Sequence, residues 1–162
     1  MSTYDEFQDR NLNIEEQLVK RHFWFLVDEF KFIYNNYSFS SDTILIEFQI
    51  GHKLPSILIY RVGEPAYMKL LLDRILQYFE GSIADQNIDF TLRSLAENII
   101  YYAQKFQKYS HKIIDEIDDW WIPVQLFQYR LFEQKYKDAG QLEGFLSGFK
   151  RDHDYLKSKG AL

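Results

Sequence analysis

The chain has 162 residues, of which 46% are hydrophobic and 18% aromatic, so it is long and apolar enough for one domain with its own core. It carries 19 lysines and arginines against 24 aspartates and glutamates, and this net charge of -5 disfavours general binding to nucleic acids. The absence of cysteine excludes disulfides, thiolate metal sites and a cysteine nucleophile. We expect residues 1–162 to form a single domain.

The N-terminal stretch MSTYDEFQDR is polar and acidic, whereas a secretory signal needs a basic start and an apolar run. No window of the sequence approaches the roughly 20 apolar residues that a membrane-spanning helix requires. We therefore predict a cytoplasmic protein that has no membrane partner.

The N-terminal third predicts a helix followed by a β-hairpin. Apolar side chains recur at helical spacing over residues 14–30, and Asn13 is suited to cap this helix, with Glu16 three residues on. Residues 44–50 and 57–62 alternate as strands do, and the short polar link between them predicts an antiparallel hairpin. Pro55 should stay at an edge of this hairpin because proline cannot donate a ladder hydrogen bond.

Two further segments are open to more than one interpretation. Residues 32–39 are a candidate third strand with a less regular alternation. Residues 65–79 carry an apolar helical face that Gly81 would close, but a fourth strand through residues 66–72 is the competing interpretation.

The C-terminal half reads as helical throughout. We predict a long helix over residues 89–114, a second over residues 120–137 that Gly140 stops, and a third from Leu142 onward. The predicted fold class is therefore α+β, with an N-terminal helix, a small antiparallel sheet of two to four strands and a helical C-terminal half.

No catalytic or cofactor motif is recognisable. GxGxxG, GxxxxGK[ST] and HExxH are all absent, so we expect no nucleotide, metal or other cofactor. The cluster Asp152-His153-Asp154 lies in a charged tail, and helical neighbours point about 100° apart, so both aspartates cannot orient one imidazole. We predict no catalytic residue and no enzymatic activity.

The stretch DEIDDWWIPV, residues 115–124, places four acids directly before two tryptophans. Asp118 or Asp119 is expected to cap the following helix, where acids favour the positive end of the helix dipole. Two consecutive tryptophans cannot face one core from a single helix, so one indole should be partly exposed. Exposed tryptophan beside acids is typical of a protein-binding surface, and the candidate partner-binding residues are therefore Asp115, Glu116, Asp118, Asp119 and Trp120.

The run FWFLVDEFKFIYNNYSF, followed by DTILIEFQIGHKLPSILIYRV, resembles small bacterial immunity proteins of polymorphic-toxin systems. The likeness covers residues 23–62 and consists of a helix ending in Phe25, Leu26, Glu29, Phe30 and Phe32, then hairpin positions Ile46, Phe48, Ile57, Ile59, Tyr60 and Arg61. The resemblance implies a cytoplasmic protein that binds a toxin domain and blocks it without turnover.

The leading hypothesis is therefore a non-catalytic protein-binding module, an immunity-type inhibitor whose partner is a basic toxin domain. The alternative is a small regulatory or scaffold subunit of a bacterial complex, homodimeric through its helical half. An enzyme that uses scattered carboxylates ranks third.

Overall fold

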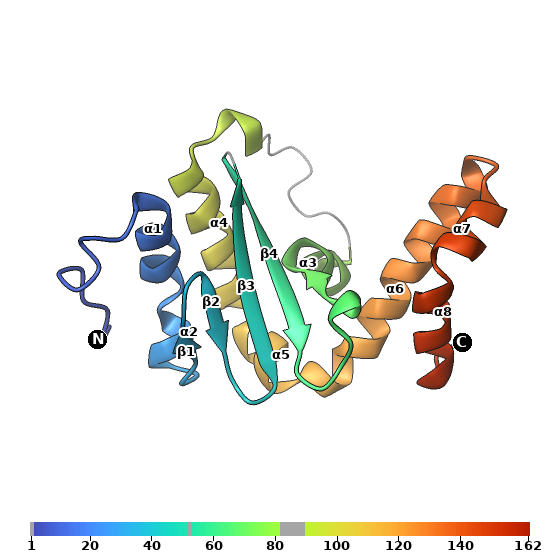
Figure 1. Cartoon of the computed structure of the whole chain (residues 1–162), viewed down its shortest axis with the longest axis horizontal. Coiled ribbons are helices and arrows are strands. Elements are labelled where there is room, and N and C mark those ends of the chain that lie inside the picture. Colours follow the sequence, from blue (N-terminus) through green and yellow to red (C-terminus); the bar gives the residue numbers. More distant parts are fainter. Residues whose placement is uncertain (1, 52, 82–89) are drawn as a thin grey trace.

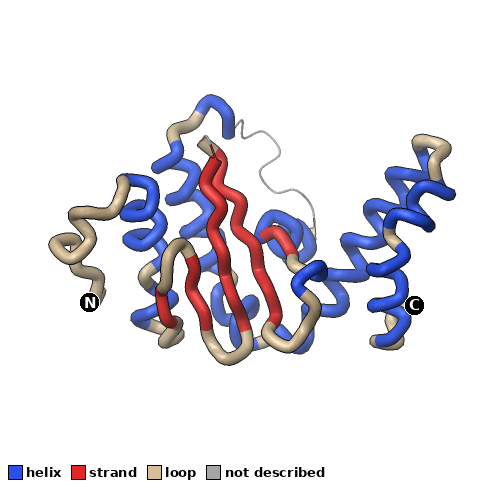
Figure 2. The backbone as a smooth tube through the Cα atoms, viewed as in Figure 1, coloured by secondary structure: helices blue, strands red, loops and turns tan. Residues whose placement is uncertain are grey.

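The computed structural model describes residues 2–51, 53–81 and 90–162. Its fold is α+β: one five-stranded antiparallel sheet carries helices on one face, and the other face is turned toward the viewer in Figures 1 and 2. The predicted fold class is confirmed, but the expected two to four strands are too few.

The N-terminal helix is broken near its end. Helix α1 spans Ile14–Phe23 and α2 spans Phe25–Asp28, so the single helix predicted over residues 14–30 is split at Trp24. The Asn13 side chain accepts a hydrogen bond from the Glu16 backbone N–H at 2.8 Å, which confirms the predicted cap.

The strands follow one another across the sheet in the order β1-β2-β3-β4-β5. Their bounds are Ile33–Tyr34, Ser38–Ser40, Ile44–Gly51, Leu54–Arg61 and Leu70–Leu71. The β3–β4 hairpin is the one that the alternation predicts, with Ile46 opposite Ile59. Strand β5 pairs only with Leu58 and Ile59, so Pro55 lies beyond the end of β5, where no donor to a neighbour is needed.

Both ambiguous segments contain more structure than the sequence indicated. Residues 32–39 form two strands because Asn36 and Tyr37 adopt positive φ values of 43° and 61° and turn the chain between β1 and β2. In residues 65–79 both interpretations hold in part, since a short 3-10 helix at Ala66–Met68 and strand β5 precede helix α3, Leu72–Glu80. Gly81 ends α3 with a φ of 71°, as predicted.

The remaining elements are helical, as expected. They are a 3-10 turn at Phe90–Leu92, then α4 Leu95–Lys108, α5 Ser110–Asp115, α6 Ile117–Asp138, α7 Leu142–Gly148 and α8 Lys150–Ser158. The single helix predicted over residues 89–114 is wrong, because α4 begins after the Ser94 capping box and ends at Tyr109.

The main core lies between the sheet and the helices behind it. Ile44, Ile46 and Phe48 point from β3 into this core, where they meet side chains of α1, α3, α4 and α6. The end of α6 extends past the sheet and carries α7 and α8 as an arm (Figure 1). Within the described ranges, none of the helices has the length and apolar character needed to cross a bilayer.

Candidate functional site

The four acids of the DEIDDWWIPV stretch lie together on the surface where α5 meets α6. Asp115 and Glu116 end α5 and begin the turn, while Asp118 and Asp119 occupy the first turn of α6. All four are exposed. The predicted caps are wrong, because α6 starts three residues earlier than expected and Glu116 takes the capping position without a side-chain bond.

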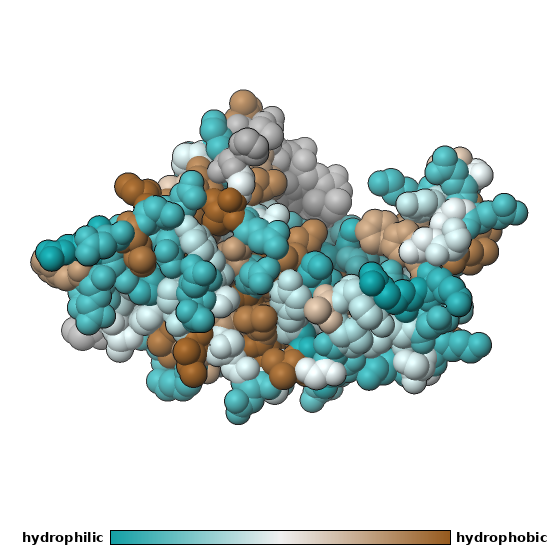
Figure 3. Space-filling model, viewed as in Figure 1, coloured by the Kyte–Doolittle hydropathy of each residue, from teal (hydrophilic) through white to brown (hydrophobic). Residues whose placement is uncertain are grey.

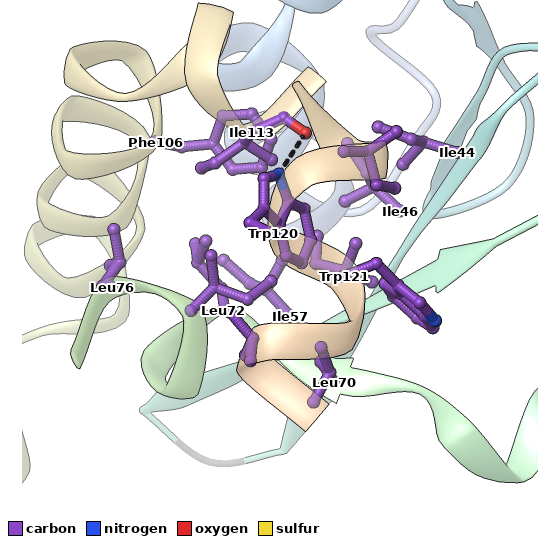
Figure 4. Close-up of a cluster of buried hydrophobic side chains, with 14 of the residues drawn as sticks. Ile44, Ile46, Ile57, Leu70, Leu72, Leu76, Phe106, Ile113, Trp120 and Trp121 are labelled. Carbon is purple, nitrogen blue, oxygen red and sulfur yellow. Dashed lines mark hydrogen bonds between the residues drawn. The ribbon is translucent and has the colours of Figure 1, made fainter. Parts of the chain in front are cut away.

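The prediction that one indole is exposed is also wrong. Trp120 is 3% exposed and Trp121 is 1% exposed. Figure 4 shows the two rings leaving α6 in different directions, Trp120 among the labelled core side chains and Trp121 away from them. The Trp120 Nε1–H donates to the carbonyl oxygens of Lys112 and Ile113 at 3.1 Å, whereas the Trp121 Nε1–H donates to the Tyr155 hydroxyl at 2.9 Å.

The physical reason is that α6 is covered on two sides. Phe79 of α3 meets Trp120 edge-on at 6.0 Å between ring centroids, and Tyr155 of α8 covers the side of Trp121. One helix can therefore bury neighbouring tryptophans in different directions. The acidic turn is left with charge but without the aromatic anchor that a protein-binding hot spot requires.

Part of that charge is already used inside the molecule. Asp118 forms an ion pair with Arg61 at the end of β4, and the Asp115 carboxylate lies 3.0 Å from Nδ1 of His111 one helical turn earlier. The turn thus contributes to holding α6 against the sheet.

A polar cluster around Glu64 fixes the C-terminal arm to the sheet. The Glu64 carboxylate accepts hydrogen bonds from the Tyr155 hydroxyl and from Nζ of Lys159, both at 3.0 Å, and pairs with Arg61 at 3.3 Å. Burial would raise the pKa of Glu64, but the bonds from Lys159 and Tyr155 and the charge of Arg61 lower it below its ordinary value. Burial, outweighing the bond from Trp121, also raises the pKa of Tyr155 to about 12.

Among the residues that the structure describes, the remaining ionisable groups form no candidate metal centre. Nδ1 of His153 lies 3.3 Å from the Tyr129 hydroxyl. Within the described residues, this imidazole forms no hydrogen bond with Asp152 or Asp154. Across residues 2–51, 53–81 and 90–162, no three histidine, aspartate or glutamate side chains are grouped so that they could hold a metal ion.

The surface best suited to recognition is the open face of the sheet, opposite the helices. Its apolar members project from all strands except β2, and the register places them in adjoining cross-strand rows. We call the following six residues the open-face patch: Ile33, Leu45, Leu58, Tyr60, Val62 and Leu71. In Figure 3 brown side chains gather among teal ones over the lower part of β1 to β4.

The patch is separate from the main core. Leu58 is only 6% exposed yet is not among the residues of the core cluster, because it lies between Glu47 and Leu71 on the opposite side of the sheet. Around it, Leu71 is 43% exposed and Val62 54%. Leu58 is thus a buried centre, and the apolar side chains around it are still in contact with water. A second protein surface placed over them would remove that water.

One carboxylate stands within this apolar surface. Glu47 of β3 faces the same side as Leu45 and is half-buried beside Leu58, its cross-strand partner. Its Oε1 accepts a hydrogen bond from Nε2 of Gln49 at 3.1 Å and a longer one from the Tyr60 hydroxyl at 3.5 Å. Burial and then the Glu47 charge raise the pKa of Tyr60, so this hydroxyl stays protonated as a donor.

No protein-family model, curated protein or solved structure matches this chain. The residues of the open-face patch were not among the candidates that the sequence suggested. A signal was present, however: Leu58, Tyr60 and Val62 form a second alternating apolar set over residues 57–62, where a strand with one water-facing side would carry polar residues.

Proposed function

We propose that this chain is a non-catalytic protein-binding module of the immunity type, which binds a toxin domain through the open face of its sheet and neutralises it. The observation that supports the proposal is the open-face patch, an apolar surface opposite the core to which every strand except β2 contributes. Exposed apolar surface on a water-facing sheet costs solubility, so its presence is typical of a face that a partner covers.

The acidic turn has a different role in this proposal. Acids favour encounter with a basic partner over a distance of about 8–10 Å at physiological salt, and they change association rates more than final affinity. The open-face patch supplies the apolar contact area that holds the complex together. The two regions are therefore separable by mutation.

The test is growth rescue. The product of the gene immediately upstream is expressed in a host alone and together with the chain, and growth of the host is measured in both cases; we expect this product to be the toxin. We expect wild-type chain to restore growth. A toxin that stays lethal in the presence of abundant, folded chain would overturn the proposal.

The contact surface is tested in the same assay with matched double variants. Leu71→Gln with Val62→Gln removes two apolar side chains of the open-face patch, which are 43% and 54% exposed. Leu142→Gln with Leu146→Gln makes the same change on α7 at positions 40% and 56% exposed. We expect the first pair to abolish rescue and the second to preserve it. Equal effects of the two pairs would exclude the open face as the contact surface.

The acidic turn is tested separately, with Asp115→Asn, Glu116→Gln and Asp119→Asn combined. Asp118 is left intact because it pairs with Arg61. This variant should still rescue growth, with slower association and a weaker salt dependence when the purified proteins are mixed. Complete loss of binding would return the contact surface to the turn.

A further inference from the structure

The chemistry around Glu47 narrows the kind of partner that fits the open face. Within the described strands, Glu47 is the only charged side chain at the positions that alternate onto this face. Both of its hydrogen bonds reach Oε1, so Oε2 has no bond from the described part of the chain. No ion pair to Glu47 occurs there either, although nine other pairs do.

Covering this face with an apolar surface would carry a cost. The approaching surface would remove water from Oε2 of Glu47, and a carboxylate that loses water without gaining a donor is strongly unfavourable. A cationic side chain of the partner would supply both the opposite charge and the missing donors. The Tyr60 ring beside the carboxylate offers a flat surface on which a guanidinium can stack.

Resting on the proposed function, we propose that Glu47 selects a basic partner segment, whose arginine or lysine pairs with Glu47 while apolar neighbours of that residue cover Leu45, Leu58 and Leu71. The net charge of -5 favours approach of such a segment. The partner segment is therefore expected to carry one cationic side chain with apolar side chains on both sides of it.

A second copy of this chain fits the face less well. Glu47 lies on β3, the middle strand of the sheet, so a symmetric face-to-face pair would bring two carboxylates together in an apolar interface. Like charges placed opposite one another in such a setting oppose association. We therefore expect the protein to be a monomer in solution.

The test uses a short peptide as the probe and does not require the toxin. Acetyl-Leu-Arg-Leu-amide is titrated into isotope-labelled protein, and backbone amide shifts are followed by NMR. The control peptide replaces arginine by citrulline, which has nearly the same shape but no charge. We expect shifts on β3 and β4 around Glu47 and Leu58, and roughly fivefold weaker binding of the citrulline peptide, the value of about one exposed ion pair.

A matched variant of the protein completes the test. Glu47→Gln keeps the shape and an acceptor oxygen but removes the charge, so it should bind the two peptides equally. The combined neutral variant of Asp115, Glu116 and Asp119 should retain the preference for arginine. Equal binding of both peptides to wild-type protein, or shifts centred on the acidic turn, would overturn the inference.

Two further measurements separate this inference from the proposed function. Sedimentation velocity should show a monomer, and a dimer that dissociates in the Leu71→Gln, Val62→Gln variant would refute the inference by making a second copy the occupant. If wild-type chain rescues growth and Glu47→Gln rescues it equally, the charge selection is refuted while the inhibitor function stands. If the arginine peptide binds at Glu47 but no rescue occurs, the inhibitor function fails and the charge selection stands.

Discussion

Trp120 provides the sharpest test of the packing, because the structure makes it a core residue and not a recognition residue. The substitution Trp120→Phe keeps an aromatic ring but removes the Nε1–H, which donates to the carbonyl oxygens of Lys112 and Ile113. Those carbonyls belong to α5, and the indole holds them against the start of α6. The smaller ring also leaves a gap beside Phe79.

The expected magnitude follows from these two losses. Leaving a buried carbonyl without its donor costs about 1–3 kcal/mol, and the gap left by the smaller ring adds to that cost. We expect Trp120→Phe to lower the free energy of unfolding by about 2–4 kcal/mol, a large part of the roughly 5–15 kcal/mol that holds a typical domain folded.

The matched control is Trp24→Phe. The Trp24 Nε1–H donates to the Thr3 hydroxyl at 2.8 Å in an exposed position, where water can replace the lost partner. The Trp24 ring is partly buried against the core, so the smaller ring has some packing cost there, but the expected loss of about 1–2 kcal/mol stays below that at Trp120. Both variants are unfolded in urea and followed by circular dichroism, since fluorescence would change with the tryptophan count itself.

Equal stability losses for the two variants would refute the burial assigned to Trp120. The growth-rescue assay then separates a packing role of Trp120 from a role in partner contact. A Trp120→Phe protein that is as stable as wild type but no longer rescues growth would make the indole a contact residue, contrary to the structure.

The remaining predictions concern the polar cluster around Glu64, two glycines and one helix cap. The pKa of Glu64 is lower in the folded chain than its ordinary 4.5, so the ionised carboxylate stabilises the fold above pH 4.5, and this stabilisation is lost as pH falls through the lower folded value. In urea unfolding over this pH range, the free energy of unfolding of Glu64→Gln should depend less on pH than that of wild type. The control Glu143→Gln, at an exposed position, should behave as wild type. Gly81→Ala should lower the free energy of unfolding by about 1 kcal/mol, since Gly81 has a φ of 71°. Gly144→Ala, in open space on α7, should raise it by up to about 1 kcal/mol. Melting temperatures that shift in the same direction for both variants would contradict these assignments. Ser94→Ala removes the hydroxyl that accepts a hydrogen bond from the Glu97 backbone N–H at the start of α4, so it should lower the free energy of unfolding in urea by about 1 kcal/mol. An unchanged free energy of unfolding would contradict the capping role of Ser94.

The local elements were largely readable from the sequence because their signals are local. Alternation over residues 44–50 and 57–62 predicts β3 and β4, since side chains on a strand point to opposite faces with a period of two. Asn13 marks the start of α1 and Gly81 marks the end of α3, because cap and left-handed positions impose their own residue preferences. The α+β class follows from the order of these signals.

The breaks and the extra strands depended on contacts that no local pattern contains. The split at Trp24 accompanies its bond to Thr3, and β5 is two residues long because it pairs only with Leu58 and Ile59. Periodicity indicates which side of an element is apolar, but it does not say how many neighbours will cover that element.

The candidate site shows the same division. The sequence placed Asp115, Glu116, Asp118 and Asp119 on the surface, since charged side chains are seldom buried without partners. Only the tertiary structure decided that Trp120 and its neighbour are both internal, because α3 and α8 come from distant segments to cover two sides of α6. It also decided that the described helices that pack on the sheet lie on one side of it, so none of them covers the apolar residues of the other side.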